Sequence, residues 1–197
     1  MDTKEALTAT AAQVVGFLMD FIDEKLRPKE LKKHEKATLD QIRVLLPGFQ
    51  KFVKDRWQNI RGEVKSSKVP VIECARCHEV AATIDDGVKC LFCKHTSEPR
   101  EAAWEYVQNV LGEDHYTTVK DGGIWPIFLC PDCDDECLVY CGPGGDQNPR
   151  IEFICFTCGE TWKEGELDFC GSCGQPYENE ESAMCDRCLN LQAIDDP

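Results

Sequence analysis

Six Cys-x-x-Cys pairs dominate the last two-thirds of this chain of 197 residues and limit what it can fold into. They account for twelve of its fourteen cysteines: Cys74/Cys77, Cys90/Cys93, Cys130/Cys133, Cys155/Cys158, Cys170/Cys173 and Cys185/Cys188. A gap of two residues lets both thiolates of one tight turn face a single metal ion, and two such turns complete a tetrahedral site. The sequence therefore predicts three metal sites of four thiolates each, filled by three Zn²⁺ ions.

A disulfide framework is the other common use of so many cysteines. Such frameworks belong to secreted mini-proteins, and the first residues lack the basic segment and the cleavage site of a secretory signal. The longest apolar stretches, 14–19 and 124–130, are also shorter than the roughly 20 residues that cross a membrane. We therefore expect a cytoplasmic protein without a membrane segment, whose cysteines stay reduced.

The grouping of the pairs is clear for the first site and open for the others. Cys74, Cys77, Cys90 and Cys93 form one site, because the intervening chain has the length of a β-hairpin. For the other eight cysteines we prefer the sequential grouping, because sequential connections give the simpler topology. The rival grouping joins Cys155/Cys158 to Cys170/Cys173. It leaves Cys130/Cys133 to form a site with Cys185/Cys188, across the intervening domain.

Four thiolates fill a tetrahedral site completely, whereas catalytic zinc keeps a position open for water or substrate. The sites are therefore predicted to be structural. Iron in a rubredoxin-like site is the chemical alternative, because tetrahedral sulfur also suits iron. The sequence favours zinc, since it carries no flavin or electron-transfer partner signal.

Cys137 and Cys141 stand outside the pairs. Four residues apart on a strand, they share one face. We interpret them as buried free thiols that behave as small apolar side chains; spare ligands or a redox pair are the alternatives.

The first 68 residues carry three amphipathic patterns that predict helices. The first pattern places Val14, Val15, Leu18, Phe21, Ile22 and Leu26 on one face; the second uses Leu31, Leu39, Ile42, Leu45 and Leu46; the third uses Phe49, Phe52, Val53, Trp57, Ile60 and Val64. Short links between such helices predict an antiparallel bundle. At this size the bundle buries little area by itself, so we expect it to dock on the cysteine-rich part or on another chain.

The cysteine-rich part predicts short hairpins and one helix. Strands are expected at 80–84 and 88–90, at 137–141 and 151–154, and as a further hairpin at 115–120 and 124–129; a helix is expected at 98–111. The fold class is thus a small, metal-stabilised α+β protein with an N-terminal helical bundle, three tandem zinc ribbons and one connecting helix. The expected domains are 1–68 (helical bundle), 69–98 (ribbon 1), 99–129 (linker helix and hairpin), 130–163 (ribbon 2) and 164–197 (ribbon 3).

Charge is distributed unevenly along the chain. Residues 1–73 hold 14 Lys/Arg against 11 Asp/Glu, whereas residues 74–197 hold 8 against 25. Nucleic-acid binding needs clustered basic side chains, which only residues 25–68 offer, with 13 basic and 5 acidic side chains. We interpret that segment first as a solvated helix surface and keep nucleic-acid binding through it as the alternative.

Familiar catalytic motifs are missing from the sequence. It has no phosphate-binding Gly-x-x-x-x-Gly-Lys-Ser/Thr loop, no His-Glu-x-x-His and no Gly-x-Ser-x-Gly. His34 is the histidine that we weigh as a catalytic candidate.

The order of parts resembles bacterial proteins in which a helical HEPN-type domain precedes cysteine-knuckle zinc ribbons. The resemblance rests on the segments 71–77 (VIECARC), 90–93 (CLFC), 102–112, 118–123 (TVKDGG), 130–133 (CPDC) and 156–160 (FTCGE). Active members of the HEPN family carry an Arg followed after four to six residues by a His. Arg27 and His34 meet the loosest form of this motif, but Pro28 follows the Arg and is expected to separate the two residues onto different helices.

From these patterns we predict a non-enzymatic zinc-ribbon interaction or adaptor protein that binds a macromolecular partner. The excess of negative charge favours a protein partner with a basic surface or mimicry of nucleic acid, and the N-terminal helices offer a route to homo-oligomers. The resemblance implies a context of prokaryotic RNA metabolism or phage defence. The alternative is a HEPN-like ribonuclease or RNA-binding protein that uses the basic N-terminal helices.

Overall fold

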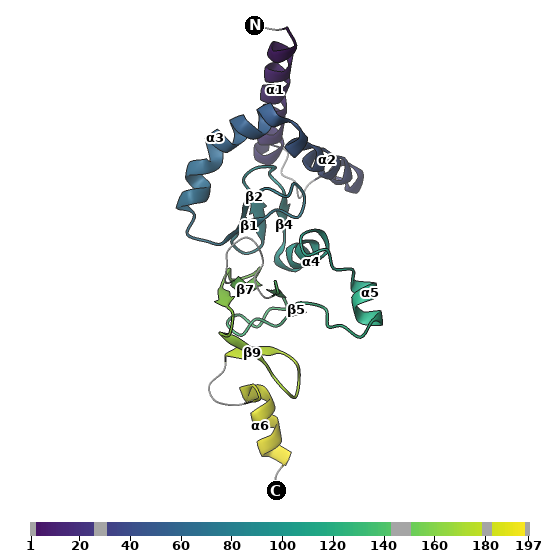
Figure 1. The fold of residues 1–197 in the computed structure, drawn as a ribbon, viewed down its shortest axis with the longest axis vertical. Helices are drawn as coiled ribbons and strands as arrows, with labels where there is room; N and C mark the ends of the chain where they lie inside the picture. Colours follow the sequence, from purple (N-terminus) through teal and green to yellow (C-terminus); the bar gives the residue numbers. More distant parts are fainter. Residues whose placement is uncertain (1–2, 26–30, 143–150, 179–182, 196–197) are drawn as a thin grey trace. The chain divides into compact units, whose positions relative to one another are not determined.

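The computed structural model describes residues 3–25, 31–142, 151–178 and 183–195 (Figure 1). The chain divides into two compact units, Met1–Glu98 and Pro99–Pro197. Both consist of helices and short antiparallel strands, so the coarse α+β class predicted from the sequence is confirmed. The finer division into five domains stays a prediction.

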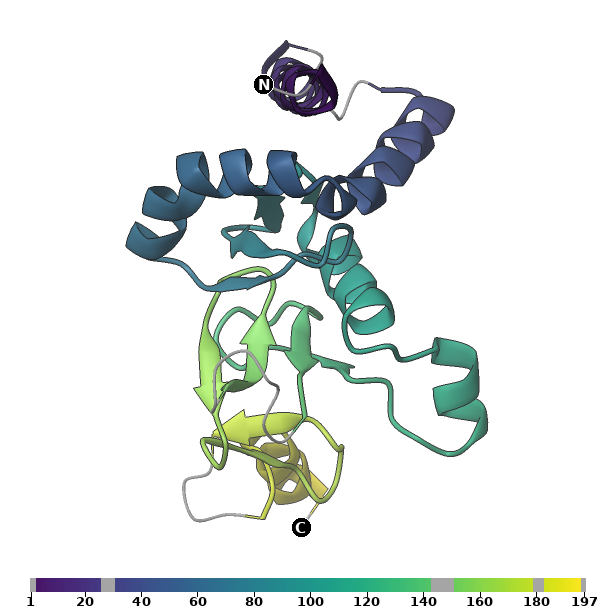
Figure 2. The ribbon, with the colours of Figure 1, turned by 45° about the horizontal axis from the view of Figure 1, so that its top comes forward.

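Helices precede a small sheet in the first unit (Figure 1 and Figure 2). The helices are α1 (Thr3–Lys25), α2 (Lys33–Leu45), a 3-10 turn η2 (Leu46–Gly48) and α3 (Gln50–Ser66). Pro47 lies within the turn η2, where its ring ends α2, as the Pro47-Gly48 pair predicts. The sheet has the order β1-β2-β3-β4, with strands Val71–Glu73, Val80–Ile84, Val88–Cys90 and Thr96–Ser97. The predicted strands 80–84 and 88–90 are confirmed, whereas the predicted antiparallel bundle stays a prediction.

The packed face of α1 differs from the predicted one. Met19 is buried at 2 % exposure, whereas Val14, Leu18 and Phe21 remain 43–50 % exposed. The helix is apolar on more than one side, so its pattern could not indicate which side packs against α3. The prediction for Leu26 lies outside the described residues.

The second unit begins with α4 (Pro99–Asn109) and α5 (His115–Lys120). A second sheet follows in the order β5-β6-β7-β8, formed by Ile127–Phe128, Leu138–Tyr140, Ile151–Cys155 and Thr161–Lys163. The two-stranded hairpin of β9 (Leu167–Phe169) and β10 (Pro176–Glu178) and the helix α6 (Asp186–Asp195) complete the unit. The predicted helix 98–111 corresponds to α4, and Gly112 follows it with a left-handed φ of 74°.

The hairpin predicted for 115–129 is wrong, because residues 115–120 form the helix α5. The Asp114 carboxylate accepts hydrogen bonds at 2.9 Å from the Thr117 N–H and at 3.0 Å from its hydroxyl. This N-cap satisfies free donors of the first helical turn. The β-branched run that suggested a strand is overridden by this cap, and no residue of α5 is buried.

One aromatic and aliphatic core supports the second unit. It contains Phe128, Leu138, Phe153, Trp162 and Leu167 together with Cys130 and Cys155. Phe169 adds ring contacts to Phe128 and Phe153 at 5.4 and 5.7 Å. The hairpin β9–β10 therefore packs on the sheet β5–β8.

The two sheets follow one plan. In each, the first strand leads into a cysteine turn, a hairpin follows, and a second cysteine turn lies between the third and fourth strands. Equivalent backbone hydrogen bonds support the match: Leu91 N–H donates to Ala81 at 2.8 Å, and Phe156 N–H donates to Cys137 at 2.9 Å. The chain thus repeats the same four-stranded element once in each unit.

No helix in the described part of the chain combines the length and the apolar character that crossing a membrane requires.

Candidate metal centres

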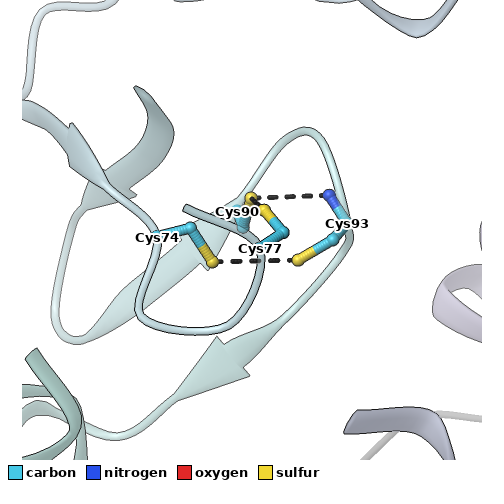
Figure 3. Close-up of side chains that lie close together, drawn as sticks. All are labelled: Cys74, Cys77, Cys90 and Cys93. Atoms are coloured by element: carbon cyan, nitrogen blue, oxygen red, sulfur yellow. Dashed lines mark hydrogen bonds between the residues drawn. The ribbon is translucent and has the colours of Figure 1, made fainter. Parts of the chain in front are cut away.

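Twelve cysteines gather in three groups of four. In each group the four sulfur atoms all lie within 4.8 Å of one another, and the groups follow the chain in order: Cys74, Cys77, Cys90 and Cys93; Cys130, Cys133, Cys155 and Cys158; Cys170, Cys173, Cys185 and Cys188. The structure therefore has the sequential grouping rather than the rival one. Figure 3 shows the four side chains of the first group converging from two separate turns.

The sulfur separations fit a tetrahedral metal site. The Sγ–Sγ distance is 3.8 Å for Cys74–Cys93 and 3.7 Å for Cys133–Cys155 and for Cys173–Cys185. A tetrahedron with zinc–sulfur bonds of about 2.3 Å has edges of about 3.8 Å. A disulfide would need a sulfur separation of about 2.05 Å, so the distances fit four thiols that could share one metal ion and do not fit disulfides.

Backbone hydrogen bonds build the same turn around five of the six pairs. The N–H of the residue after the second cysteine donates to the carbonyl of the first, at 2.8–3.1 Å. The N–H of the first cysteine donates to the carbonyl five residues later, at 2.8–3.0 Å. The residue after the second cysteine has a left-handed φ of 58–76° in all five turns, at His78, Lys94, Asp134, Gly159 and Gly174.

The sixth pair is built differently. Cys185 and Cys188 lie at the start of α6, where the N–H groups of Cys188 and Leu189 donate to the Cys185 carbonyl at 2.9 and 3.1 Å. The third group therefore joins one hairpin turn to one helix end, whereas the first two join two hairpin turns.

The ionisation of the thiols is coupled within each group. Hydrogen bonds from the Cys77 thiol and its neighbours lower the pKa of Cys74 far below its usual range. A hydrogen bond from Cys130 lowers the pKa of Cys155 to about 5 and raises the pKa of Cys130 itself. In the third group, backbone N–H groups lower the pKa of Cys170 to about 6. Four close sulfurs thus favour one thiolate and keep neighbours protonated, and a divalent cation would let all four ionise.

The groups differ in burial. All four cysteines of the first group are buried, whereas Cys158 of the second group and Cys173 of the third are exposed. Solvent therefore reaches the second and third groups more readily than the first.

Two buried arginines tie the first group to the helices that precede it. Arg56 of α3 donates to the carbonyls of Leu91 and Phe92, at 2.9 and 3.0 Å. Arg43 of α2 donates to the carbonyls of Cys93 and Lys94, at 3.2 and 3.0 Å. Four consecutive carbonyls of the second cysteine turn thus accept hydrogen bonds from two guanidinium groups. Arg43 and Arg56 are only 5 and 7 % exposed.

Carboxylates and aromatic rings complete this attachment. Asp20 of α1 pairs with Arg56 at 2.8 Å, and Asp40 pairs with Arg43 at 2.9 Å. The Phe92 ring lies 5.4 Å from the Phe52 ring, edge to face. Neither arginine was predicted from the sequence, in which the basic residues of 25–68 resemble one solvated surface. The position of Arg56 on the apolar stripe of α3 was the available indication.

Cys137 and Cys141 belong to none of the three groups. Cys137 occupies the place in β5–β8 that the buried Ala81 holds in the first sheet, and it is 4 % exposed. Burial raises the pKa of Cys141 to about 12. Both are free thiols; Cys137 is buried, as the sequence predicts, whereas Cys141 is only half-buried as a residue.

The candidate nuclease pair is not brought together within the described residues. His34 lies at the start of α2, with its side chain 77 % exposed and its Nε2 4.0 Å from Glu35 Oε1. Arg27 lies outside the described residues, so the motif stays a prediction.

Comparison of the chain with family models, with curated proteins and with solved structures finds no match.

Proposed function

We propose that the protein is a non-enzymatic interaction protein built on three structural zinc ribbons, and that its partner is a protein with a basic surface. The observation that carries the proposal is the closure of all three cysteine groups, in which four thiols surround each metal position. Such a site leaves no position for water or substrate. The metal would then stabilise the fold, and the surfaces would carry the function.

The charge of the second unit supports a basic partner. Residues 99–197 hold 5 Lys/Arg against 21 Asp/Glu, and a divalent ion with four thiolates adds two further negative charges at each of its two sites. Four of the acidic side chains, Asp132, Asp134, Asp135 and Glu136, are exposed around one cysteine turn. This negative field attracts proteins with a positively charged surface and repels the phosphates of nucleic acid.

The basic N-terminal segment is smaller than its sequence suggests. Arg43 and Arg56 are buried against backbone carbonyls, and Lys51 pairs with Asp55 at 2.9 Å. Lys32, Lys33 and Lys36 remain exposed. Binding or cleavage of RNA is therefore the second candidate, and the context of RNA metabolism or phage defence stays a prediction.

Native co-purification with the full chain as bait tests the proposal, using two matched pairs of charge-neutralising substitutions. Asp134→Asn with Asp135→Asn alters the acidic turn of the second unit, and Asp85→Asn with Asp86→Asn alters an exposed turn of the first unit. Each pair includes one aspartate of left-handed φ, Asp134 at 59° and Asp86 at 50°, a conformation that Asn tolerates.

We expect a basic protein to be retained by the parent and by the first-unit pair, and its retention to fall about tenfold in the second-unit pair and at high salt. Retention of RNA, weakened when Lys32, Lys33 and Lys36 are made neutral, would replace the proposal with nucleic-acid binding. RNA cleavage that disappears in His34→Ala would replace it with a ribonuclease.

A further inference from the structure

The exposed face of α1 repeats with the spacing of a helix-pairing surface. Its residues, called the α1 seam here, are Leu7, Ala11, Val14, Leu18 and Phe21. They follow one another at alternating steps of four and three, the spacing that keeps apolar side chains aligned between two helices. Leu7 is 72 % exposed and Val14 is 50 % exposed.

The opposite face of α1 is already in use within the first unit. Met19 is buried, and Asp20 pairs with Arg56 of α3. Gly16 faces Phe52, so that a Cβ on the glycine would lie 3.9 Å from the ring. The seam is therefore held away from α3, and Figure 1 shows the N-terminal part of α1 extending beyond α3.

We propose that the α1 seam binds the α1 seam of a second copy of this chain. Residues 6–19 contain no charged side chain, so this part of α1 cannot bind a partner through ion pairs. A second helix of the same apolar spacing complements the seam, and a two-fold axis supplies that helix from an identical chain. This pairing is independent of the basic partner proposed for the second unit.

The exposed area is sufficient for a dimer of modest affinity. Four residues of the seam, Leu7, Val14, Leu18 and Phe21, and the neighbouring Phe17 are 43–72 % exposed. Together these five equal roughly three fully exposed large side chains of about 200 Å² each. Complete burial of these side chains in both copies would reach at most about 1,200 Å², the lower end of the range for specific interfaces. Phe17 and Phe21 already stack at 6.1 Å, so the aromatic part of the surface is preformed.

A membrane surface fits the seam less well than a second copy. Helices that lie in the membrane interface carry Lys and Arg on the face opposite the apolar one. In α1 the opposite face packs against α3 and presents Asp20 to a buried arginine, so it has no such cations to offer.

Sedimentation velocity of the metal-loaded full chain tests the pairing, with two matched variants. Leu7→Glu with Val14→Glu places like charges on both copies of the seam. Leu45→Glu with Val44→Glu makes the same change on α2, where these residues are 63 and 59 % exposed. Metal content and circular dichroism must equal those of the parent in both variants, which all four exposed positions allow.

We expect the parent and the α2 variant to dimerise at tens of micromolar, and the seam variant to be monomeric, with dissociation at least tenfold weaker. Two differently tagged parent copies should also co-purify, and the seam variant should not. A parent that is monomeric at 100 micromolar (on the order of ten times the expected constant) overturns the proposal. So does seam-dependent binding of the monomer to phosphatidylserine vesicles, or a seam variant that still dimerises.

Discussion

The first and third cysteine groups present the same four ligands in different surroundings. The first is fully buried, and Arg43 and Arg56 attach its second turn to two helices. The third has the exposed Cys173, and its last pair begins a helix that ends the described chain. The same set of four cysteines therefore has two structural roles. The first group joins the sheet of the first unit to its helices, and the third group joins the hairpin β9–β10 to the helix α6 in the second unit.

Substitution of one cysteine, either in the first group or in the third, should give the largest difference in stability between the two groups. A structural zinc site contributes roughly 10–16 kcal/mol to folding, about as much as the total stability of a domain. Cys90→Ser should therefore lower the metal content from three to two and unfold the first unit. Cys173→Ser should also lose one metal, but leave the first unit folded.

Fluorine NMR with 5-fluorotryptophan separates these outcomes, because Trp57 is the tryptophan of the first unit and Trp104, Trp125 and Trp162 belong to the second. The Trp57 signal should move to its unfolded position in Cys90→Ser and stay in Cys173→Ser. Equal effects of the two substitutions on Trp57 would remove the distinction between the groups.

Truncation of the buried Arg56 should give the next largest effect on stability. Arg56→Ala leaves the Leu91 and Phe92 carbonyls without their donor, and we expect a loss of about 3 kcal/mol from the first unit. Arg61→Ala, on an exposed position of the same helix, is the control and should change stability by less than about 0.5 kcal/mol. Urea unfolding followed at the Trp57 signal measures both, and similar losses would show that the attachment does not support the fold.

Acid should release the metals in an order that follows exposure. Metal binding requires thiolates, so protons compete with the metal and affinity falls as the pH falls. The third group should lose its metal first and the buried first group last. A metal-sensitive dye during a slow titration from pH 7 to pH 4 should record separate steps; release of all metal in one step would contradict the ranking.

The smallest effect is expected from the hydrogen bond that joins Trp57 Nε1 to Glu79 at 2.9 Å. Trp57→Phe keeps an aromatic ring against Phe92 and removes this bond, which should lower the stability of the first unit by about 1 kcal/mol. Glu79→Gln keeps an acceptor and serves as the control. Thermal unfolding of the first unit by circular dichroism measures the difference. A loss of stability as large as that of Arg56→Ala would show that Trp57, and not Arg56, contributes most to joining α3 to the sheet.

Spacing along the chain predicted the parts of this structure that depend on neighbours in sequence. The cysteine turns and the strands Val80–Ile84 and Val88–Cys90 follow from two-residue gaps and a tight turn. The parts that depend on distant residues were missed. Nothing near Arg56 in sequence indicates that Leu91 and Phe92 will offer it their carbonyls, 35 and 36 residues away.

Local competition explains the other differences. The segment 115–120 has strand-forming residues, yet the Asp114 cap directs it into a helix. In α1, apolar residues surround most of the helix, so periodicity alone could not distinguish the packed face at Met19 from the exposed seam. The candidate Arg27 lies outside the described residues, so the nuclease motif rests on the sequence alone.

Native mass spectrometry with thiol counting tests whether each of the three closed groups of four cysteines holds one zinc ion. We expect a holo protein with three zinc ions and two cysteines outside the sites, Cys137 and Cys141. Gentle alkylation of the holo protein should leave the twelve ligands unmodified, and chelation followed by unfolding should expose all fourteen thiols. Any iron, any disulfide, or a metal content other than three would contradict this expectation.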